Sequence, residues 1–482
     1  MLGAVKDGGF ARTWNTLSRE NIMKNGCTTS LAAAVLSAAA FMYSAMAQPY
    51  EYAVFDLGYL EARFATALGI NEDGAVVGIA GMFRNNHGYV WEAPGPMEDL
   101  GTLAGHDWYS AADAINDLGW VAGSSGESSI RDVPVLWRDG VPVNLSGSIV
   151  GTMGFANDLN NAGTVVGRWL KDIGGGEDVL LAFVWEDGVM TQLPSLIGGD
   201  AWSEASAIND AGDIVGWTEG EPYDVPVLWR DNEVIHLGRL PDGGNTGEAR
   251  DINDLEQATG FIYDRRGFNH AFLWEDGVMS DIHGFGDESY AYAINNYGDV
   301  VGFNQPIWYI DVFTAFRWTE AEGMIELDTR LPPLCPYGVT SARDINDAGQ
   351  IVGSATFNGS KYPDWAVILS PVHHSMSLRA AGGRLISGAS NELIVRGATP
   401  GKRVYFAYAE QGGGTYIPGC TLQENALQLL NPVTLGYTVA NANGIARLRR
   451  SIPADAQGLT LLLQALTPGE CAVSELIMMT IE

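Results

Sequence analysis

The sequence of 482 residues is 46% hydrophobic and 18% charged, which excludes an intrinsically disordered chain and leaves enough length for two or more domains. The net charge is −31; residues 1–47 contribute +2 and residues 372–482 contribute +1, so residues 48–371 carry about −34. This acidity argues against nucleic acid or an anionic membrane as a partner and favours a well-solvated surface, with cation binding as the alternative.

The N-terminal segment has the pattern of a secretory signal peptide. A basic start at Lys24 is followed by an apolar run from Leu31 to Met42 and by the small-residue site Ala45-Met46-Ala47. We predict that residues 1–47 are removed by cleavage after Ala47. Met23 is the better start of such a signal, so residues 1–22 are interpreted as a misannotated leader. The apolar run is short for a bilayer span, so we expect an exported mature chain without one.

The central part of the chain is a sevenfold repeat. Aligned on one asparagine, the copies follow one another at intervals of 42 to 51 residues, and such a period indicates a solenoid or a propeller. An alanine always stands four residues before this asparagine, and a glycine always stands seven residues after it. The aligned asparagines are Asn71, Asn116, Asn160, Asn209, Asn253, Asn295 and Asn346.

Each repeat contains four short strand patterns, which is the composition of a propeller blade. The third pattern ends in Trp in six repeats, and Leu369 takes that position in the seventh. The seventh repeat lacks its fourth strand, but Tyr52–Gly58 has the missing pattern and precedes the first repeat. We therefore predict a seven-bladed β-propeller over residues 48–371, closed by pairing the N-terminal strand with the last blade.

The recurring Asn-Asp-x-Gly segments are interpreted as tight turns between the first and second strands. Calcium loops are the alternative, but the segments lack the D-x-D-x-D-G ligand run and a distal glutamate, so we expect no cofactor. The invariant alanine is expected where first strands crowd around the axis, and the second glycine where backbones approach closely or a bulge occurs. Glu256 replaces the turn glycine in one repeat.

At these residues the chain resembles the HAF-repeat family, named for the His-Ala-Phe that occurs here as His270-Ala271-Phe272. The resemblance covers residues 52–371. It implies a secreted bacterial protein whose biochemical role is not established. Only one repeat has His-Ala-Phe, so a repeated catalytic histidine is not expected.

The connections between second and third strands, and between blades, should share one face of the propeller. They are the longer and more variable segments, and such loops commonly carry binding residues. We predict that aromatic residues on this face bind an extracellular glycan or protein, the alternative being that these rings pack between blades. The candidate residues are Trp108, Tyr109, Trp169, Trp202, Tyr223, Trp308 and Tyr309.

Catalysis finds little support in the sequence, because none of the seven histidines lies in a nucleophile or metal motif. The leading hypothesis is a non-catalytic, monomeric binding or surface-associated protein. Two alternatives stay open: a propeller enzyme that cleaves carbohydrate or peptide with acidic loop residues, and a calcium-stabilised structural repeat protein.

The repeat stops near residue 371, and residues 372–482 show alternating strand patterns broken by glycine and proline. We predict a small β-sandwich with a disulfide between Cys420 and Cys471, which attaches the protein to a surface or caps the propeller. Cys335 is then an odd, buried thiol.

Overall fold

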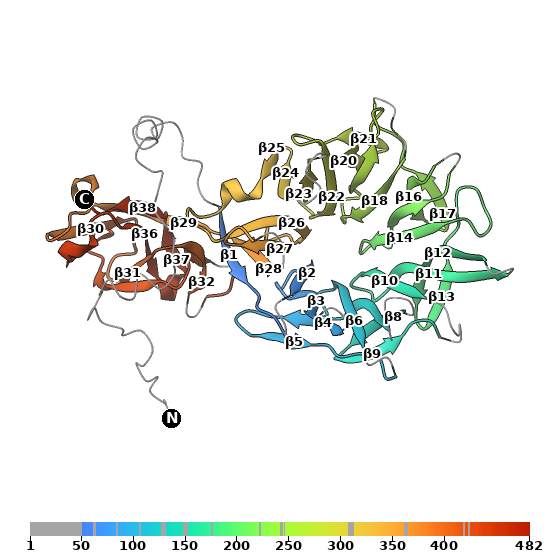
Figure 1. Cartoon of the computed structure of the whole chain (residues 1–482), viewed down its shortest axis with the longest axis horizontal. Helices are drawn as coiled ribbons and strands as arrows, with labels where there is room; N and C mark the ends of the chain where they lie inside the picture. The colour runs from blue at the N-terminus through green and yellow to red at the C-terminus, as the bar shows by residue number, and fades with distance from the viewer. Residues whose placement is uncertain are drawn as a thin grey trace.

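The computed structural model describes residues 51–482 except for 61–63, 83–84, 106–107, 127–131, 148–152, 175–176, 221–222, 242–243, 245, 307–312, 361–364, 418–419 and 423–424. The predicted signal peptide lies outside the described residues. Seven four-stranded antiparallel sheets form a ring, and a smaller all-β domain lies beside it (Figure 1). The predicted seven-bladed propeller is confirmed. Within the described segments, no helix has the length and apolar character to cross a membrane.

Six blades are built from consecutive strands, and the seventh takes its fourth strand from the N-terminal side of the ring. Blade 1 consists of β2 (Ala65–Ile70), β3 (Val76–Met82), β4 (Asn85–Trp91) and β5 (Met97–Asp99). Blade 2 consists of β6 (Tyr109–Ile115), β7 (Val121–Gly126), β8 (Val133–Arg138) and β9 (Val141–Asn144). Blade 3 consists of β10 (Gly154–Leu159), β11 (Val165–Gly174), β12 (Glu177–Glu186) and β13 (Val189–Gln192). Blade 4 consists of β14 (Ser203–Ile208), β15 (Ile214–Thr218), β16 (Val225–Arg230) and β17 (Glu233–His236). Blade 5 consists of β18 (Gly247–Ile252), β19 (Ala258–Tyr263), β20 (Asn269–Glu275) and β21 (Val278–Asp281). Blade 6 consists of β22 (Glu288–Ile294), β23 (Val300–Gln305), β24 (Thr314–Thr319) and β25 (Gly323–Glu326). Blade 7 consists of β26 (Tyr337–Ile345), β27 (Ile351–Phe357), β28 (Trp365–Pro371) and β1 (Tyr52–Asp56), and the 3-10 helix η1 (Leu327–Arg330) precedes it.

The ring closes through β1, which pairs antiparallel with β28 from Tyr52 opposite Pro371 to Asp56 opposite Val367. Figure 1 shows this blue strand among the orange strands of blade 7, although more than 300 residues separate them in the chain. Leu369 faces Ile351 in the same register in which Trp91 faces Val76. Closure leaves no strand edge of the ring open between the first and last blades.

A β-bulge in every first strand explains the invariant alanine and glycine. In blade 4 the ladder between β14 and β15 shifts after Ala205, which pairs with Gly216, and the other six blades shift at the same place. A Cβ atom on Gly216 would lie 2.0 Å from the carbonyl oxygen of Glu204, so no larger residue fits. Both explanations offered for the second glycine, close approach and a bulge, are therefore confirmed.

The turn at Glu256 keeps the geometry of the glycine turns. Its φ of 62° is in the left-handed region, and its amide donates to the Asn253 carbonyl as Gly212 donates to that of Asn209. The Glu256 carboxylate binds Arg230, with 2.9 Å between Oε2 and Nη2. An exposed ion pair thus accompanies the strained backbone of the one turn that lacks glycine.

The C-terminal domain is one sheet of eight strands that curls until its two end strands, β34 and β35, lie against each other. The predicted small β-domain is thus present, and the layers expected of a sandwich belong to a single, nearly closed sheet. Its elements are β29 (His374–Ala380), η2 (Ala381–Gly383), β30 (Ser390–Arg396), β31 (Arg403–Ala409), β34 (Val433–Val439), β35 (Ile445–Ser451), η3 (Ala454–Ala456), β36 (Thr460–Thr467), η4 (Pro468–Glu470), β37 (Ala472–Ser474) and β38 (Ile477–Thr480), with a separate hairpin of β32 (Gly412–Tyr416) and β33 (Ala426–Leu429).

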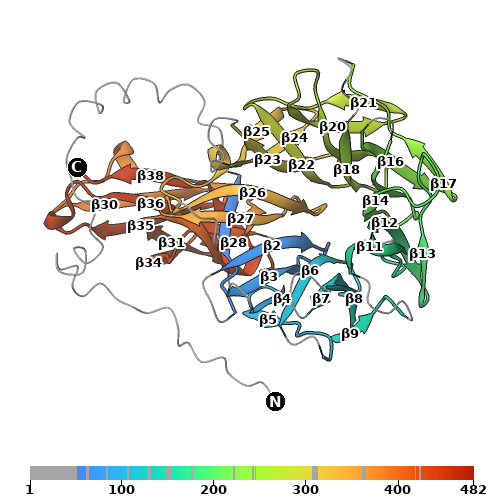
Figure 2. The ribbon, with the colours of Figure 1, turned by 45° about the vertical axis from the view of Figure 1, so that its right-hand side comes forward.

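The hairpin β32–β33 packs against β1, the closing strand of the propeller (Figure 1), and the strands of the C-terminal domain extend beside those of blade 7 (Figure 2). The rings of Phe55 in β1 and Tyr416 in β32 are 4.7 Å apart, and Gln428 Nε2 donates to the Tyr52 carbonyl at 3.2 Å. Phe55 belongs to a hydrophobic core that continues from blades 7 and 1 into the C-terminal domain, and Tyr416 packs against this core. The predicted disulfide between Cys420 and Cys471 is present and ties the hairpin to the curled sheet. Cys335 is a free thiol, and burial raises its pKa to about 11.

Candidate functional site

The seven first strands surround the propeller axis. Each contacts the first strand of the blade before it and of the blade after it, and β26 of blade 7 contacts β2 of blade 1. Side chains of these strands therefore form layers around the axis, in the order in which they follow one another along the strand. The turn face is the end where first and second strands join, and the loop face is the opposite end.

At the turn face, the repeat asparagines form a closed ring of hydrogen bonds. Each Nδ2 donates to the backbone carbonyl of the equivalent asparagine in the next blade, at 2.9 to 3.3 Å, and Asn346 returns to Asn71. Each Oδ1 accepts the backbone amide four residues later, at 2.8 to 3.0 Å. The asparagines therefore cap their own turns, as predicted, and also join neighbouring blades.

A second ring lies one residue further along the chain. Each of its side-chain oxygens accepts the backbone amide of the equivalent residue in the blade before it, at 2.8 to 3.0 Å. The carboxylates of this ring thus already hold the blades together. Its members are Glu72, Asp117, Asn161, Asp210, Asp254, Asn296 and Asp347. Within the described parts of the chain, no group of three or more His, Cys, Asp or Glu side chains is arranged to hold a metal ion.

The aromatic residues proposed from the sequence are spread over the loop face. Trp108 directly precedes blade 2, whereas Trp202 and Tyr223 both lie at the loop end of blade 4; the three side chains are 56%, 46% and 59% exposed. Tyr109, the first residue of β6, and Trp169, in the middle of β11, are half-buried. No ring contact or hydrogen bond joins any two of these five described residues. Trp308 and Tyr309 lie outside the described residues.

A different set of side chains comes together near the axis, at positions directly before or after the invariant alanines or directly after the invariant glycines. Its members occupy the first and second strands of blades 2 to 7, at positions that differ from repeat to repeat. We call this set the inner polar cluster. It consists of Asp113, Asn157, Arg168, Glu204, Trp217, Glu248, Arg250, Tyr292 and Arg343.

Glu204 is the centre of the cluster in blades 3 and 4. Its side chain is only 10% exposed, and Oε2 lies 2.6 Å from Arg168 Nη1 and 3.3 Å from Trp217 Nε1. Asn157 Nδ2 donates to Oε1 at 3.0 Å. Three donors from two blades thus satisfy a buried carboxylate, which would otherwise destabilise the fold.

In blades 5 to 7 the cluster alternates cations and rings. Arg250 pairs with Glu248, and its guanidinium carbon lies 5.9 Å from the centre of the Tyr292 ring. Arg343 lies over the same ring at 4.3 Å. Tyr292 in turn stacks on Phe303 with centroids 5.6 Å apart. These aromatic faces and charged groups offer both stacking and hydrogen-bonding surfaces.

Burial shifts the acid–base properties of this region. It raises the pKa of Asp113 to about 7, although the Arg168 guanidinium acts in the opposite direction. Burial also raises the pKa of Glu248, against the effect of Arg250. Near the outer end of the same strand as Asp113, burial raises the pKa of Tyr109 to about 12, and the Asp113 and Asp132 carboxylates add to this. Asp113 is therefore a carboxyl group that changes charge near neutral pH.

The inner polar cluster was not predicted from the sequence, because contacts such as those of Arg168 and Asn157 with Glu204 cross a blade boundary. Phe155, Glu204 and Glu248 directly precede the invariant alanine in their blades, and each pairs with the residue that follows the invariant glycine. Arg168 and Trp217 occupy that second position. The signal was present as three positions whose residue type changes from repeat to repeat: those directly before and directly after the invariant alanine, and that directly after the invariant glycine.

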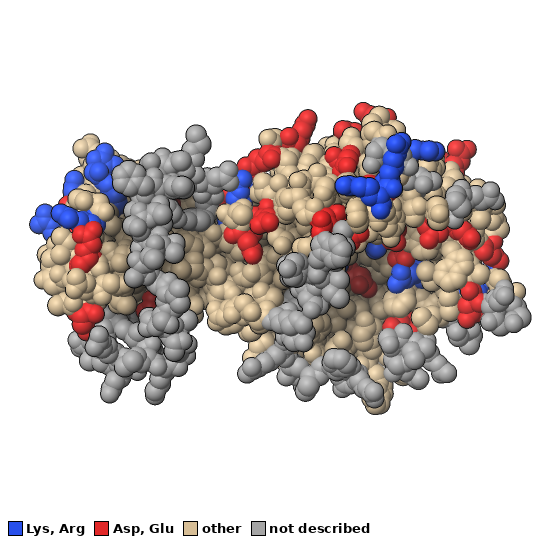
Figure 3. All heavy atoms as spheres, turned by 45° about the horizontal axis from the view of Figure 1, so that its top comes forward, with Lys and Arg blue, Asp and Glu red and all other residues tan. Residues whose placement is uncertain are grey.

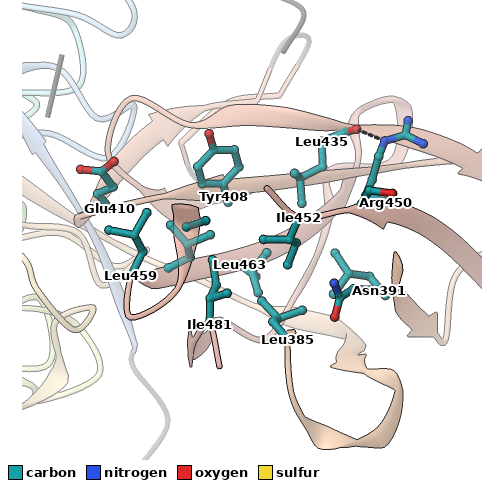
Figure 4. Close-up of a pocket in the computed structure, with 14 residues that line it drawn as sticks. Leu385, Asn391, Tyr408, Glu410, Leu435, Arg450, Ile452, Leu459, Leu463 and Ile481 are labelled. Atoms are coloured by element: carbon teal, nitrogen blue, oxygen red, sulfur yellow. Dashed lines mark hydrogen bonds between the residues drawn. The ribbon is translucent and has the colours of Figure 1, made fainter. Parts of the chain in front are cut away.

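A separate cavity of about 50 Å³ lies in the C-terminal domain between the two ends of the curled sheet (Figure 4). Most of its lining is aliphatic, including Leu385, Leu459 and Leu463, and Glu410, Arg450 and Asn391 also border it. At its edge Arg450 Nε donates to the Leu435 carbonyl at 2.8 Å and so links β35 to β34. The cavity thus presents mainly hydrocarbon, whereas the inner polar cluster presents carboxylates and guanidinium groups that can form hydrogen bonds and ion pairs.

Comparison with known proteins does not assign a function. No protein-family model and no curated protein matches the chain. Solved structures similar to it include TolB from Acinetobacter baumannii, with a TM-score of 0.35 and 11% identity over 62% of this chain and 80% of that one. The propeller domain of the Trilobed protease from Pyrococcus furiosus gives 0.34 and 12%, over 55% and 98%. The Aleuria aurantia lectin, in complex with a methyl fucoside, gives 0.33 and 12%, over 59% and 99%.

Proposed function

We propose that the protein is an extracellular, non-catalytic binding module, and that its propeller holds a glycan or a peptide segment of another protein at the inner polar cluster. The observation that carries this proposal is the convergence of carboxylates, arginines and aromatic rings from six blades on the inner strands of the propeller. Ligand sites commonly fix their ligands with aromatic side chains and a small number of precisely placed polar groups. Such a site serves hydroxyl- or amide-bearing ligands.

The inner polar cluster is preferred over the exposed loop aromatics as the principal site. The loop residues are separated, whereas the cluster residues contact one another across blade boundaries. A ligand on the axis would therefore meet several fixed groups at once, and preorganised groups bind with a smaller entropic penalty.

Export is part of the proposal. The Cys420–Cys471 disulfide supports it, because such bonds persist mainly in oxidising compartments. The resemblance to secreted HAF-repeat proteins and the signal-like N-terminal segment point in the same direction.

The test is an array of glycans and peptides probed with residues 48–482 and with two variants, Asp113→Asn and Trp108→Ala. Asp113 has no hydrogen-bond partner in the described protein, so the isosteric variant should fold normally. We expect the wild-type protein to bind a defined subset of probes, Asp113→Asn to weaken that binding about tenfold, and Trp108→Ala to leave it unchanged. The opposite pattern would place the site on the outer loops, and an absence of binding to every probe would refute the proposal.

Hydrolysis is the second candidate function, and the pKa of Asp113 is the observation that favours it. A carboxyl group with a pKa of about 7 is still largely protonated below neutral pH and suits a general acid. In that case the cleavage of oligosaccharide or peptide substrates should fall as pH rises through about 7 and be lost in Asp113→Asn. Binding without turnover between pH 5 and 8 would support the binding module instead.

A further inference from the structure

Arg343 differs from the other half-buried arginines of the propeller. Each of the others lies within ion-pair distance of at least one carboxylate, whereas Arg343 forms no ion pair and no hydrogen bond within the described protein. The paired arginines are Arg168, Arg230, Arg250, Arg317 and Arg330. A partly buried cation without an anion is unfavourable for folding, so its retention in the first strand of blade 7 calls for a partner.

The surroundings of Arg343 restrict what that partner is. The guanidinium rests on the Tyr292 ring at 4.3 Å, and its buried Nε has no hydrogen-bond partner within the described protein. On the other side of Tyr292, Arg250 is neutralised by Glu248. Arg343 is therefore the uncompensated positive charge of the inner polar cluster, and its planar fork matches a carboxylate in geometry.

The residues that occupy the position of Arg343 in the first strands of the other blades show how a ligand would be oriented. Read from blade 1 to blade 7 they are Leu68, Asp113, Asn157, Ser206, Arg250, Tyr292 and Arg343. Across the ring closure, an unpaired cation at Arg343 and an unpaired carboxyl group at Asp113 flank the apolar Leu68. This arrangement fits a ligand with a negative group at one end and a hydrogen-bond donor at the other.

The charge of the propeller adds selectivity. Figure 3 shows Asp and Glu scattered over its visible face, whereas Lys and Arg gather mainly at the free end of the C-terminal domain and in one group on the propeller. Residues 48–371 carry about −34, so the field around the propeller disfavours anions in general. One unpaired arginine in such a field suits a singly charged carboxylate better than a doubly charged phosphate.

We propose that Arg343 binds a carboxylate of the ligand, with the Tyr292 ring fixing the guanidinium plane. This inference rests on the proposed function and names the ligand class: a carboxylate carried by a uronic acid or by the C-terminus of a peptide. The two sources share one chemistry, and the experiment separates them.

The test measures affinity by titration calorimetry with four probes: trigalacturonic acid, its methyl ester, a tripeptide with a free C-terminus, and the same tripeptide amidated. We expect one carboxylate probe to bind at least about tenfold more tightly than its neutral counterpart. The pair that shows this difference identifies the source. Arg343→Gln should abolish the difference by weakening only the charged probe, and Arg343→Lys should restore part of it, since charge returns without the fork.

Arg138→Gln is the matched control. Arg138 also lies over an aromatic ring, that of Trp120 at 4.0 Å, but it is exposed and belongs to the turn side of blade 2. Its loss should leave all four affinities unchanged, which separates a local effect at Arg343 from the general loss of one positive charge. Near-ultraviolet circular dichroism checks that each variant is folded.

The possible failures are distinct. Equal binding of acidic and neutral probes by the wild-type protein, sensitive to Asp113→Asn, would overturn the role of Arg343 and leave the proposed function intact. A carboxylate preference that survives in Arg343→Gln would overturn it as well. No binding of any probe by the folded wild-type protein would overturn both.

Discussion

The repeat asparagine shows how one residue stabilises both its own turn and the ring. Its Oδ1 caps the turn that follows, and its Nδ2 reaches the carbonyl of the next blade. Turn chemistry in the sequence predicted the first bond. The second depends on the neighbouring blade and becomes visible only in the closed ring.

Asn209→Asp isolates the bond between blades. The new side chain keeps the oxygen that accepts the Asp213 amide but turns an oxygen toward the Asn253 carbonyl, at the place of a 3.1 Å hydrogen bond. We expect the free energy of unfolding, measured by denaturant titration, to fall by about 1–3 kcal/mol. Asn232→Asp is the control, an isosteric change at an exposed position of the same blade. Equal effects of the two variants would contradict a specific role of the ring.

At the scale of the strand, the bulge of the first strands creates a second kind of joint. Asp344 in blade 7 accepts the amide of Ile345 in its own strand and of Ile70 in blade 1, both at 2.8 Å. Asp158 links blades 3 and 4 in the same way, and Asp251 links blades 5 and 6. Burial, together with the Asp251 carboxylate, raises the pKa of Asp344 to about 7, and burial raises that of Asp251 to about 6.

These shifts predict the direction of a pH dependence. A carboxyl group with a folded pKa above its unfolded value binds protons more strongly in the folded state. Between about pH 4 and 7, this group therefore makes the free energy of unfolding fall as pH rises. Asp344→Asn should flatten that slope in denaturant titrations at pH 5 and 7.5, whatever its effect on overall stability. The exposed Asp187→Asn should not change the slope, and an unchanged slope in Asp344→Asn would contradict the prediction.

The strands themselves were largely predictable, and the joints between them were not. Alternating apolar residues, Asn-x-x-Gly turns and the shared fourth strand at Tyr52 define seven blades from local patterns alone. Asp158, Asp251 and Asp344 carry no such signal, because their partners lie 43 to 274 residues away in the next blade. The same reason hid the inner polar cluster, whose members Arg168 and Glu204 meet only after the blades are placed side by side.

At the scale of the molecule, the C-terminal domain reinforces the closure of the ring. Its hairpin packs on β1, and the core around Phe55 and Tyr416 belongs to both domains. The sequence predicted the disulfide that holds this hairpin but not the surface on which the hairpin lies, since aromatic residues 361 positions apart share no periodicity. The two domains should therefore unfold together.

Replacement of both Cys420 and Cys471 by Ser tests this coupling. The bond closes a segment with a sequence separation of 51 residues, and loss of such a bond destabilises a small domain by about 2–5 kcal/mol. Calorimetry should show one transition at lower temperature for the whole chain. Cys335→Ser, which removes the free thiol, is the matched control. A separate propeller transition at the wild-type temperature would contradict the shared core.

The bridging carboxylates Asp158, Asp251 and Asp344 join the blades in pairs, which an odd number of blades does not allow throughout the ring. Each bridging carboxylate accepts two backbone amides, one from the next residue of its own strand and one from the first strand of the next blade. Asp158, Asp251 and Asp344 together therefore satisfy one amide in each of six blades. Because each bridging aspartate joins two blades, three of them join six blades, and in a ring of seven one blade stays without such a bridge. This is blade 2, where Ala114 takes the place of the aspartate and Asp113 directly precedes it. The parity of the ring thus leaves one blade without a bridging carboxylate, and that blade carries the acid of the proposed site.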